Sequence, residues 1–287
     1  MSIILLTGIS GSGKSVSLNA LEDSGYFCVD NLPPKLLKAL VKTIINENEN
    51  KLAVAVDARS AISLAELPKD INWLRNQGYH LDVIFLTAKT DSLINRFSET
   101  RRSHPLSHKF SIIKNEGQKL TLTECIEAER ELLSEIQEIS FLIDTSGLST
   151  NKLRTYIKDL VQKKNAPLSL LFESFAFKSG VPLDADLVFD ARILTNPFYD
   201  ESLRFKSGMD AEVINFLNAQ IDVTKMFEDI KKFIENWLPY FKKDNRSYLT
   251  VAIGCTGGQH RSVFLTEKLA SYFLDKASIL TRHRDLY

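Results

Sequence analysis

The sequence predicts an α/β protein: an N-terminal parallel sheet with helices on both faces, followed by a second, smaller α/β domain. One observation is that short apolar runs alternate with longer stretches in which Leu, Ile and Ala recur at helical spacing. Another is that an apolar run in each half leads into a glycine-containing loop and then into a helical stretch. Such alternation is typical of parallel sheets, whose strands are connected through helices.

The predicted strands of the first domain are short apolar runs. They lie at residues 3–7, 26–29, 52–56, 81–87 and 141–143. A helical stretch at 151–161 then leads into the polar KKNAP, which ends in Pro167 and predicts a domain boundary. We therefore assign residues 1–164 to the first domain and residues 165–287 to the second.

The second domain repeats this order less regularly. Its predicted strands are the runs LSLLFESFAF, LVFDARI and YLTVAIG, and its predicted helices lie at 211–217, 223–237 and 262–274. The chain has no repeat at a fixed period and no low-complexity tract, which argues against a solenoid or an array.

Composition excludes several classes of protein. The 287 residues are 44% hydrophobic and 25% charged, which is ordinary for a globular chain. Lys+Arg and Asp+Glu both number 36, so no global field attracts the protein to nucleic acid or membrane, and any polyanion site must be local. The widely spaced Cys28, Cys125 and Cys255 argue against a disulfide scaffold or a structural zinc site. With no apolar segment long enough to span a membrane, we expect a cytoplasmic protein.

The clearest motif is GISGSGKS, which follows the first apolar run. It fits G-x-x-x-x-G-K-[ST], in which glycines allow successive backbone N–H groups to curl around a phosphate. Lys14 would place a charge over the outer phosphates, and Ser15 would offer a hydroxyl to Mg²⁺. The predicted nucleotide-binding residues, for ATP or GTP with Mg²⁺, are Gly8, Ile9, Ser10, Gly11, Ser12, Gly13, Lys14 and Ser15. The alternative is a glycine-rich turn with an incidental lysine.

A nucleotide site of this kind also needs an acidic residue at the end of a neighbouring strand, to hold Mg²⁺ or its waters. Asp57, at the end of LAVAVD, is the preferred metal ligand beside Ser15, and Asp30 in YFCVDNLPP is its competitor. Each aspartate could instead cap a helix or a turn. Lys14 and Asp57 are therefore the predicted catalytic residues.

The segment RFSETRRSHPLS carries several basic side chains, among them Arg96, Arg101, Arg102 and His104. Nucleotide kinases of this general architecture have an arginine-bearing lid at this point in the chain, which closes over the transferring phosphoryl group. By analogy we assign Arg96, Arg101 and Arg102 to a lid. The alternative is a solvated basic helix end.

A second loop of phosphate size, CTGGQHRS, lies between the apolar run YLTVAIG and a helical stretch. Cys255 and Arg261 have the C-x5-R spacing with which cysteine phosphatases surround a phosphate, and Ser262 follows. This pattern predicts an anion site, and the alternative is a tight turn whose glycines serve packing. Catalysis by Cys255 would further need an acid for the leaving group and a depressed thiol pKa, and no feature of the sequence establishes either.

The chain resembles the RapZ/YvcJ family of nucleotide-binding proteins along its whole length. The matching stretches are GISGSGKSVSLNALEDSGYFCVDNLP, FSETRRSHPL, DTSGLS, FESFAFKSGVPLDADLVFDARILTNP and NRSYLTVAIGCTGGQHRSVFLTEKLA. The resemblance implies a kinase-like P-loop domain that binds ATP and GTP with slow hydrolysis, and a C-terminal domain that senses a phosphorylated metabolite. In the enterobacterial branch it implies an oligomeric RNase adapter that senses glucosamine-6-phosphate and presents a small RNA to RNase E.

The resemblance also assigns residues. It implies a guanine-nucleotide segment at Asp57, Ala58, Arg59 and Ser60. Together with the C-x5-R loop, it implies a sugar-phosphate pocket formed by Lys178, Arg192, Cys255, Thr256, Gly257, Gly258, His260, Arg261 and Ser262. Two features depart from the adapter branch. Phe198 stands where that branch has a histidine, and the thin basic patch Arg282, His283 and Arg284 stands in place of a basic RNA-binding tail.

Four functions follow from these residues. The preferred one is a regulatory protein that binds nucleotide and reports a phosphorylated ligand. The second is a small-molecule kinase that uses the P-loop, the Mg²⁺ aspartate and the arginine lid. The third is an RNA-binding module in which nucleotide turnover is incidental, and a phosphatase that uses Cys255 comes last.

Overall fold

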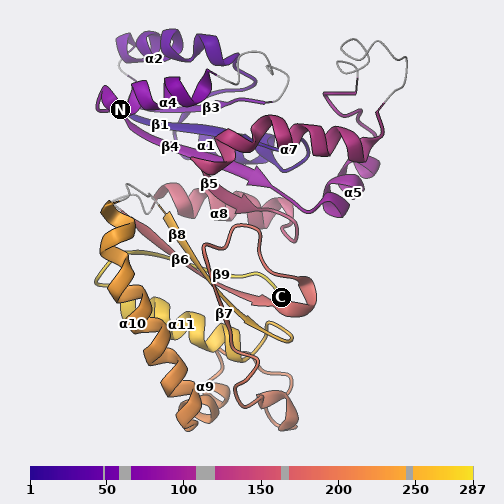
Figure 1. Cartoon of the computed structure of the whole chain (residues 1–287), viewed down its shortest axis with the longest axis vertical. Coiled ribbons are helices and arrows are strands. Elements are labelled where there is room, and N and C mark those ends of the chain that lie inside the picture. The colour runs from indigo at the N-terminus through magenta and orange to yellow at the C-terminus, as the bar shows by residue number, and fades with distance from the viewer. Residues whose placement is uncertain (48, 58–65, 108–119, 163–167, 244–247, 287) are drawn as a thin grey trace. The chain divides into compact units, whose positions relative to one another are not determined.

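The structure is a computed structural model that describes residues 1–47, 49–57, 66–107, 120–162, 168–243 and 248–286 (Figure 1). Contacts between Cα atoms divide the chain into two compact units, Met1–Val161 and Gln162–Tyr287. The predicted boundary between residues 164 and 165 lies outside the described residues. Each unit is built on a parallel sheet with helices packed against it, which confirms the predicted α/β class.

The first unit contains a sheet of five parallel strands in the order β2-β3-β1-β4-β5. The strands are β1 (Ser2–Gly8), β2 (Phe27–Val29), β3 (Lys51–Ala55), β4 (His80–Thr87) and β5 (Phe141–Asp144). In the central strand β1, Ile3, Ile4, Leu5 and Leu6 are fully buried, as expected when both faces of a parallel sheet are covered. Because the strands are parallel, the loops that follow them share one edge of the sheet.

Helices cover both faces of this sheet. They are α1 (Lys14–Glu22), α2 (Leu37–Asn46), α4 (Leu67–Asn76), α5 (Thr90–Thr100), α7 (Leu122–Glu138) and α8 (Thr150–Gln162). On one face, Leu5 of β1 shares a hydrophobic core with Val41 of α2, Ile71 of α4 and Ile126 of α7. Figure 1 shows α2 and α4 on that side of the sheet and α8 on the other.

The start of α7 is fixed by a capping box. The Thr121 backbone N–H donates to the Glu124 carboxylate at 2.7 Å, and the Glu124 N–H donates back to the Thr121 hydroxyl at 3.3 Å. This reciprocal pair satisfies two backbone donors that the helix itself leaves open. It therefore sets the register of α7, which carries a buried glutamate of the candidate site.

The second unit contains four parallel strands in the order β7-β8-β6-β9. The strands are β6 (Ser169–Ala176), β7 (Leu187–Asp190), β8 (Tyr248–Cys255) and β9 (Ser278–His283), and the helices are α9 (Ala211–Asn218), α10 (Ile221–Lys243) and α11 (Arg261–Phe273). Phe172 of β6 and Val251 of β8 share a core with Val213 of α9, Ile234 of α10 and Leu269 of α11.

Two elements of the second unit differ from the expectation. The strand β9, with the sequence SILTRH, has no counterpart among the predicted strands. The helix α10 continues past the predicted end at residue 237 to Lys243, with Pro239 in its last turns. Its apolar residues Ile230, Ile234 and Leu238 repeat at helical spacing and pack into the core, which outweighs the backbone hydrogen bond that proline lacks.

Candidate functional site

The loop between β1 and α1 needs its glycines for steric reasons. Gly8 has φ 135°, and a Cβ placed there would lie 2.1 Å from the Leu86 carbonyl oxygen on the neighbouring strand β4. Gly13, the N-cap residue of α1, has φ 106°, and its Cβ would lie 2.5 Å from Leu153 of α8. Only glycine tolerates both the backbone angle and the contact. The loop therefore lies tightly between β4 and α8 and opens into the N-terminus of α1.

Lys14 and Ser15 form the first turn of α1. The Lys14 Nζ donates to the carbonyl oxygens of Gly8 at 2.5 Å and Ile9 at 3.3 Å, so the side chain folds back over the loop. The Ser15 side chain is exposed. Because the first N–H groups of a helix have no partner within the helix, this end of α1 favours an anion. The ammonium group, the helix end and the Ser15 hydroxyl all come from one short stretch of chain.

Asp57 follows β3, the strand directly beside β1, so it lies on the same edge of the sheet as the loop. Its side chain is 8% exposed, and the amide nitrogen of Asn31, assigned from hydrogen bonding, donates to the two carboxylate oxygens at 3.1 and 3.3 Å. Asp30 is exposed and follows β2, one strand further from β1. The topology therefore favours Asp57 over Asp30 as the acidic residue nearest the loop. Ala58, Arg59 and Ser60 lie outside the described residues.

The three predicted lid arginines have different environments. Arg96 of α5 is bound to the loop and to the end of β5: its guanidinium donates to the Gly11 carbonyl at 3.0 Å and to the Thr145 carbonyl at 2.5 Å. Arg101 ends α5 in the left-handed conformation, with φ 52°, and both Arg101 and Arg102 are exposed. Arg96 therefore supports the loop, while the other two side chains face solvent.

Sequence reasoning missed a buried glutamate beneath the loop. The Glu129 carboxylate on α7 accepts the Ser10 backbone N–H at 2.8 Å and the Ser10 hydroxyl at 2.7 Å, and His104 Nε2 lies 3.1 Å from it. Burial acts to raise the pKa of Glu129, but the hydrogen bond from His104 and the charge of Lys14, with the Ser10 bonds, outweigh it and lower that pKa. Glu129 is therefore a buried, charged contact of the loop.

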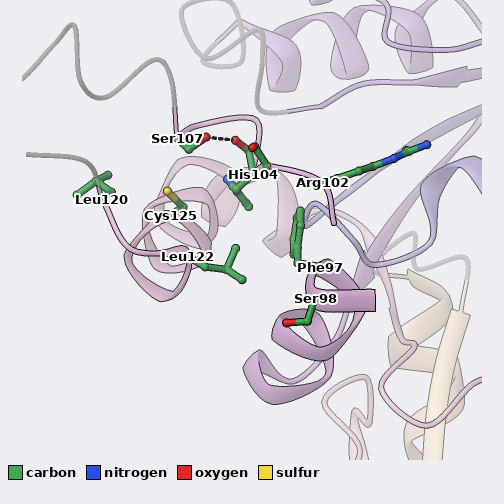
Figure 2. A pocket seen from close by; sticks show the side chains of 9 residues that line it. Phe97, Ser98, Arg102, His104, Ser107, Leu120, Leu122 and Cys125 are labelled. Carbon is green, nitrogen blue, oxygen red and sulfur yellow. Dashed lines mark hydrogen bonds between the residues drawn. The ribbon is translucent and has the colours of Figure 1, made fainter. Parts of the chain in front are cut away.

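A cavity of about 330 Å³ lies next to this network (Figure 2). It is lined by Phe97, Ser98, Arg102, Ser103, His104, Ser107, Leu120, Leu122 and Cys125. The wall residue Phe97 also lies behind the nucleotide loop, because a Cβ at Gly11 would be 3.2 Å from its ring. Figure 2 shows the hydrogen bond from the Ser107 hydroxyl to the His104 carbonyl, which is 2.7 Å long and fixes the turn that carries His104.

The C-x5-R loop of the second unit joins β8 to α11. Its two ends are linked, because the Cys255 Sγ lies 3.1 Å from the Ser262 Oγ. Gly258 has φ 70° and packs against Ala176 of β6, whereas a Cβ at Gly257 would meet no atom within 4 Å. Thr256 and Gly257 are exposed, so the loop has an open side at its tip.

Arg261 and His260 are buried and hold neighbouring main chain. The Arg261 guanidinium donates to the carbonyl oxygens of Arg192 at 2.8 Å and Leu194 at 2.9 Å. Its Nε is buried and has no hydrogen-bond partner in the part of the chain that the structure describes. The His260 Nε2 lies 3.1 Å from the Leu203 carbonyl, and burial lowers the pKa of this histidine. Arg261 thus organises the loop and retains one unused donor.

The remaining predicted pocket residues lie at the same edge of the second sheet. Lys178 follows β6 and is exposed, and Arg192 follows β7. The Arg192 guanidinium pairs with Asp190 at 2.6 Å and stacks on the Phe177 ring at 3.8 Å from its centroid. The structure therefore places the ends of β6 and β7 and the loop that begins at Cys255 at one edge of the sheet. The Arg192 guanidinium is already paired with the Asp190 carboxylate.

Matches to protein families cover both units. Residues 1–165 match the model of the RapZ-like N-terminal domain, and residues 168–287 match that of the RapZ C-terminal domain. The chain belongs to the RapZ family. Among RapZ-family relatives, a nucleotide-binding protein of Janthinobacterium sp. (strain Marseille) is 64% identical over 100% of both chains. One of Burkholderia mallei (strain SAVP1) is 55% identical over 99% of this chain and 96% of its own.

Two solved structures that resemble this RapZ-family chain each align with about half of it. Shikimate kinase from Bacteroides thetaiotaomicron aligns with 56% of this chain and 97% of its own, with 13% identity and a TM-score of 0.36. The tunicamycin resistance protein of Deinococcus radiodurans aligns with 56% and 95%, with 19% identity and a TM-score of 0.36. Among the described residues, no helix is long and apolar enough to cross a membrane, and no cluster of three His, Cys, Asp or Glu side chains could hold a metal.

Proposed function

We propose that this RapZ-family protein is a regulator that binds ATP or GTP with Mg²⁺ at loop 8–15, hydrolyses it slowly, and senses a phosphorylated amino sugar through its second unit. The observation that carries the proposal is that each unit places a glycine-containing loop between a parallel strand and a helix N-terminus. Such loops collect backbone N–H groups and a positive helix end around an anion. Two such loops in one chain suit a protein that couples a nucleotide to a second phosphorylated ligand.

The nucleotide half of the proposal is supported by the side chains around the first loop. Lys14 is the charge that would move from the Gly8 and Ile9 carbonyls to the outer phosphates. Ser15 and Asp57 are the oxygen donors that would hold Mg²⁺ or its waters, and oxygen ligands suit this hard cation. Bound Mg²⁺ would neutralise the phosphate charge that develops during hydrolysis.

The sensing half is supported by the loop that begins at Cys255. The buried Arg261 retains an unused Nε donor, and Gly257 leaves the tip of the loop open. A phosphate monoester accepts such charge-assisted hydrogen bonds well. Lys178 and Arg192 at the ends of β6 and β7 would add charge at the same edge.

The proposed role as an adapter that presents a small RNA to an RNase requires an oligomer. The basic patch at the end of the chain is largely engaged within the unit: Arg282 pairs with Asp184 at 3.3 Å, and His283 lies 2.8 Å from Glu267. Because RNA affinity depends on how many phosphates are neutralised, one copy of this patch would bind a small RNA weakly. Several copies in a homo-oligomer would bind it more tightly and could then present it to an RNase.

A thermal-shift screen of nucleotides and sugar phosphates tests both halves at once. A ligand that binds only the folded protein raises its stability by RT ln(1 + [L]/Kd), or about 2.7 kcal/mol at a hundredfold excess over Kd. We expect ATP, GTP and glucosamine-6-phosphate each to raise the unfolding midpoint. Absence of a shift with both nucleotides would refute the first half, and absence of a shift with every sugar phosphate would refute the second.

Asp57→Asn should separate nucleotide binding from metal-dependent hydrolysis. The variant keeps the size of the side chain but removes the charge that favours Mg²⁺. We expect ATP binding in EDTA to stay within about threefold of the parent, and Mg²⁺-dependent hydrolysis to fall at least about tenfold. Asp30→Asn, at the end of β2, is the matched control and should have a smaller effect. If Asp30→Asn causes the larger loss, Asp30 is the metal ligand.

A small-molecule kinase is the second candidate, and the cavity in Figure 2 favours it. The serine hydroxyls and Arg102 that line this cavity could bind a polar acceptor. The Phe97 side chain lies between the cavity and the nucleotide loop. A kinase would transfer the γ-phosphoryl group to such an acceptor at about 1–100 s⁻¹. Incubation with labelled ATP and a panel of hydroxylated metabolites distinguishes the two functions, because a regulator gives only slow release of inorganic phosphate.

A further inference from the structure

We infer that Glu129 and His104 form a positioning pair that holds Ser10, and through it the nucleotide loop, in the shape that binds a nucleotide. The inference rests on the proposed binding of nucleotide at loop 8–15 and adds residues that the loop motif does not contain. Neither side chain is placed in contact with the nucleotide. Their effect on binding passes through Ser10.

Three donors converge on the Glu129 carboxylate. The Ser10 N–H bonds to Oε2 at 2.8 Å, the Ser10 hydroxyl bonds to Oε1 at 2.7 Å, and His104 Nε2 lies 3.1 Å from Oε2. The Leu106 backbone N–H donates to His104 Nδ1 at 3.2 Å, so Nδ1 is the acceptor and Nε2 carries the proton. The tautomer is thus fixed, and His104 donates to Glu129.

This arrangement requires the loop to keep one orientation. The side chains of Glu129 and His104 are 0% and 1% exposed, and a buried carboxylate is costly unless its donors stay in place. Rotation of Ser10 away from α7 would remove two of the three hydrogen bonds at once. Because the Ser10 N–H points at Glu129, the phosphate must be bound by the N–H groups that follow it in the loop and in the first turn of α1.

Neighbouring residues of the loop are also held by hydrogen bonds within the protein. The Ile9 N–H donates to the Leu86 carbonyl at 3.0 Å, and the Ser12 carbonyl accepts from the Thr145 hydroxyl at 2.9 Å. The contact at Ser10 differs from these because it is charged and because His104 belongs to the wall of the cavity. The pair therefore connects the cavity-lining segment to the loop.

Two substitutions at Glu129 separate its hydrogen bonds from its charge. In Glu129→Gln, the amide oxygen can accept from Ser10 N–H and His104, and the amide nitrogen can donate to the Ser10 hydroxyl, so all three bonds survive without the charge. Glu129→Ala removes them. We expect Glu129→Ala to raise the Kd for ATP at least about tenfold, and Glu129→Gln to bind ATP as well as or better than the parent, because a negative charge near the phosphates is lost.

Two substitutions at His104 test the pair without removing the buried carboxylate. In His104→Gln the amide nitrogen replaces Nε2 and can still donate to Glu129, whereas in His104→Asn the amide oxygen replaces Nδ1 and keeps only the Leu106 bond. We expect a Kd for ATP within about threefold of the parent for His104→Gln, and about tenfold higher for His104→Asn. Glu131→Ala and Glu131→Gln, on the exposed side of α7, are the matched controls.

The measurements are the Kd for ATP by calorimetric titration and the unfolding midpoint without nucleotide, on the full chain. Folded Glu129→Ala with parental affinity would overturn the inference, as would an equal loss in Glu129→Gln and Glu129→Ala. If Glu129→Ala does not fold, equal affinities of His104→Gln and His104→Asn overturn it instead. A parent chain that does not bind ATP would overturn the proposed function, whereas a parent that binds and variants that all bind equally would overturn only the positioning pair.

Discussion

Lys14→Ala is expected to raise the Kd for ATP and GTP about 30- to 100-fold, which corresponds to a loss of ~2–3 kcal/mol of binding free energy. The physical reason is that the ammonium group is the motif's own positive charge for the outer phosphates. Lys14 bonds the partly buried carbonyls of Gly8 and Ile9, so its removal should lower the free energy of unfolding by about 1 kcal/mol. Calorimetric titration and thermal unfolding measure the two effects.

Lys42→Ala on the exposed side of α2 is the control for this substitution, since it removes one positive charge from the same unit. It should leave both the Kd and the unfolding midpoint unchanged. A folded Lys14→Ala protein with the parental Kd would show that loop 8–15 does not bind the phosphates.

Arg261→Ala should have the second large effect, on sugar-phosphate binding and on stability together. The substitution leaves the partly buried carbonyl of Arg192 and the buried carbonyl of Leu194 without this donor, at about 1–3 kcal/mol for each group, so the second unit should lose ~2–6 kcal/mol of unfolding free energy. It also removes the Nε donor, and affinity for glucosamine-6-phosphate should fall at least about a hundredfold. Arg204→Ala, which removes a surface bond to the Phe198 carbonyl, is the control.

Cys255→Ser separates binding from catalysis in the same loop. A serine keeps a hydroxyl close to Ser262 but is a far poorer nucleophile without a neighbouring base, so a sensor should keep its affinity within about threefold. Titration with glucosamine-6-phosphate beside a phosphatase assay of the parent decides between sensor and enzyme. Full binding by folded Arg261→Ala would refute the pocket, and phosphatase turnover that Cys255→Ser abolishes would make the protein an enzyme.

The sequence was most informative where local patterns decide the structure. The five strands of the first unit are largely apolar, and each was predicted from its apolar run. The central strand β1 is buried on both faces, whereas the edge strand β2 is partly exposed. The strand β9 was missed because its sequence, SILTRH, mixes apolar and basic residues. Arg282 and His283 take part in β9 only because Asp184, Glu267 and Ser174, distant in sequence, supply their partners. Side-chain partners that are distant in sequence leave no pattern in the residues of the strand itself.

The same limit applies to the candidate site. The glycines of loop 8–15 were predicted from the motif, since their backbone angles are a local property. Glu129 was missed, although it has a signal: it stands among Ile126, Leu133 and Ile136 on the apolar side of α7, where a charged residue needs a buried partner. Sequence spacing suggested that Arg261 faces a phosphate, but it could not show that the guanidinium also binds the Arg192 and Leu194 carbonyls.

The anchored loop also has a consequence for kinetics. Ile9, Ser10 and Ser12 are held by contacts within the protein to β4, α7 and the end of β5, so little of the loop has to become ordered during the encounter with a nucleotide. Association should then proceed at the ordinary rate for a preformed site, and differences in affinity should appear in the dissociation rate. Such a site exchanges its nucleotide at the rate of dissociation, because no slow folding step is needed before the next nucleotide binds. Its occupancy can therefore follow a change in the relative concentrations of the nucleotides.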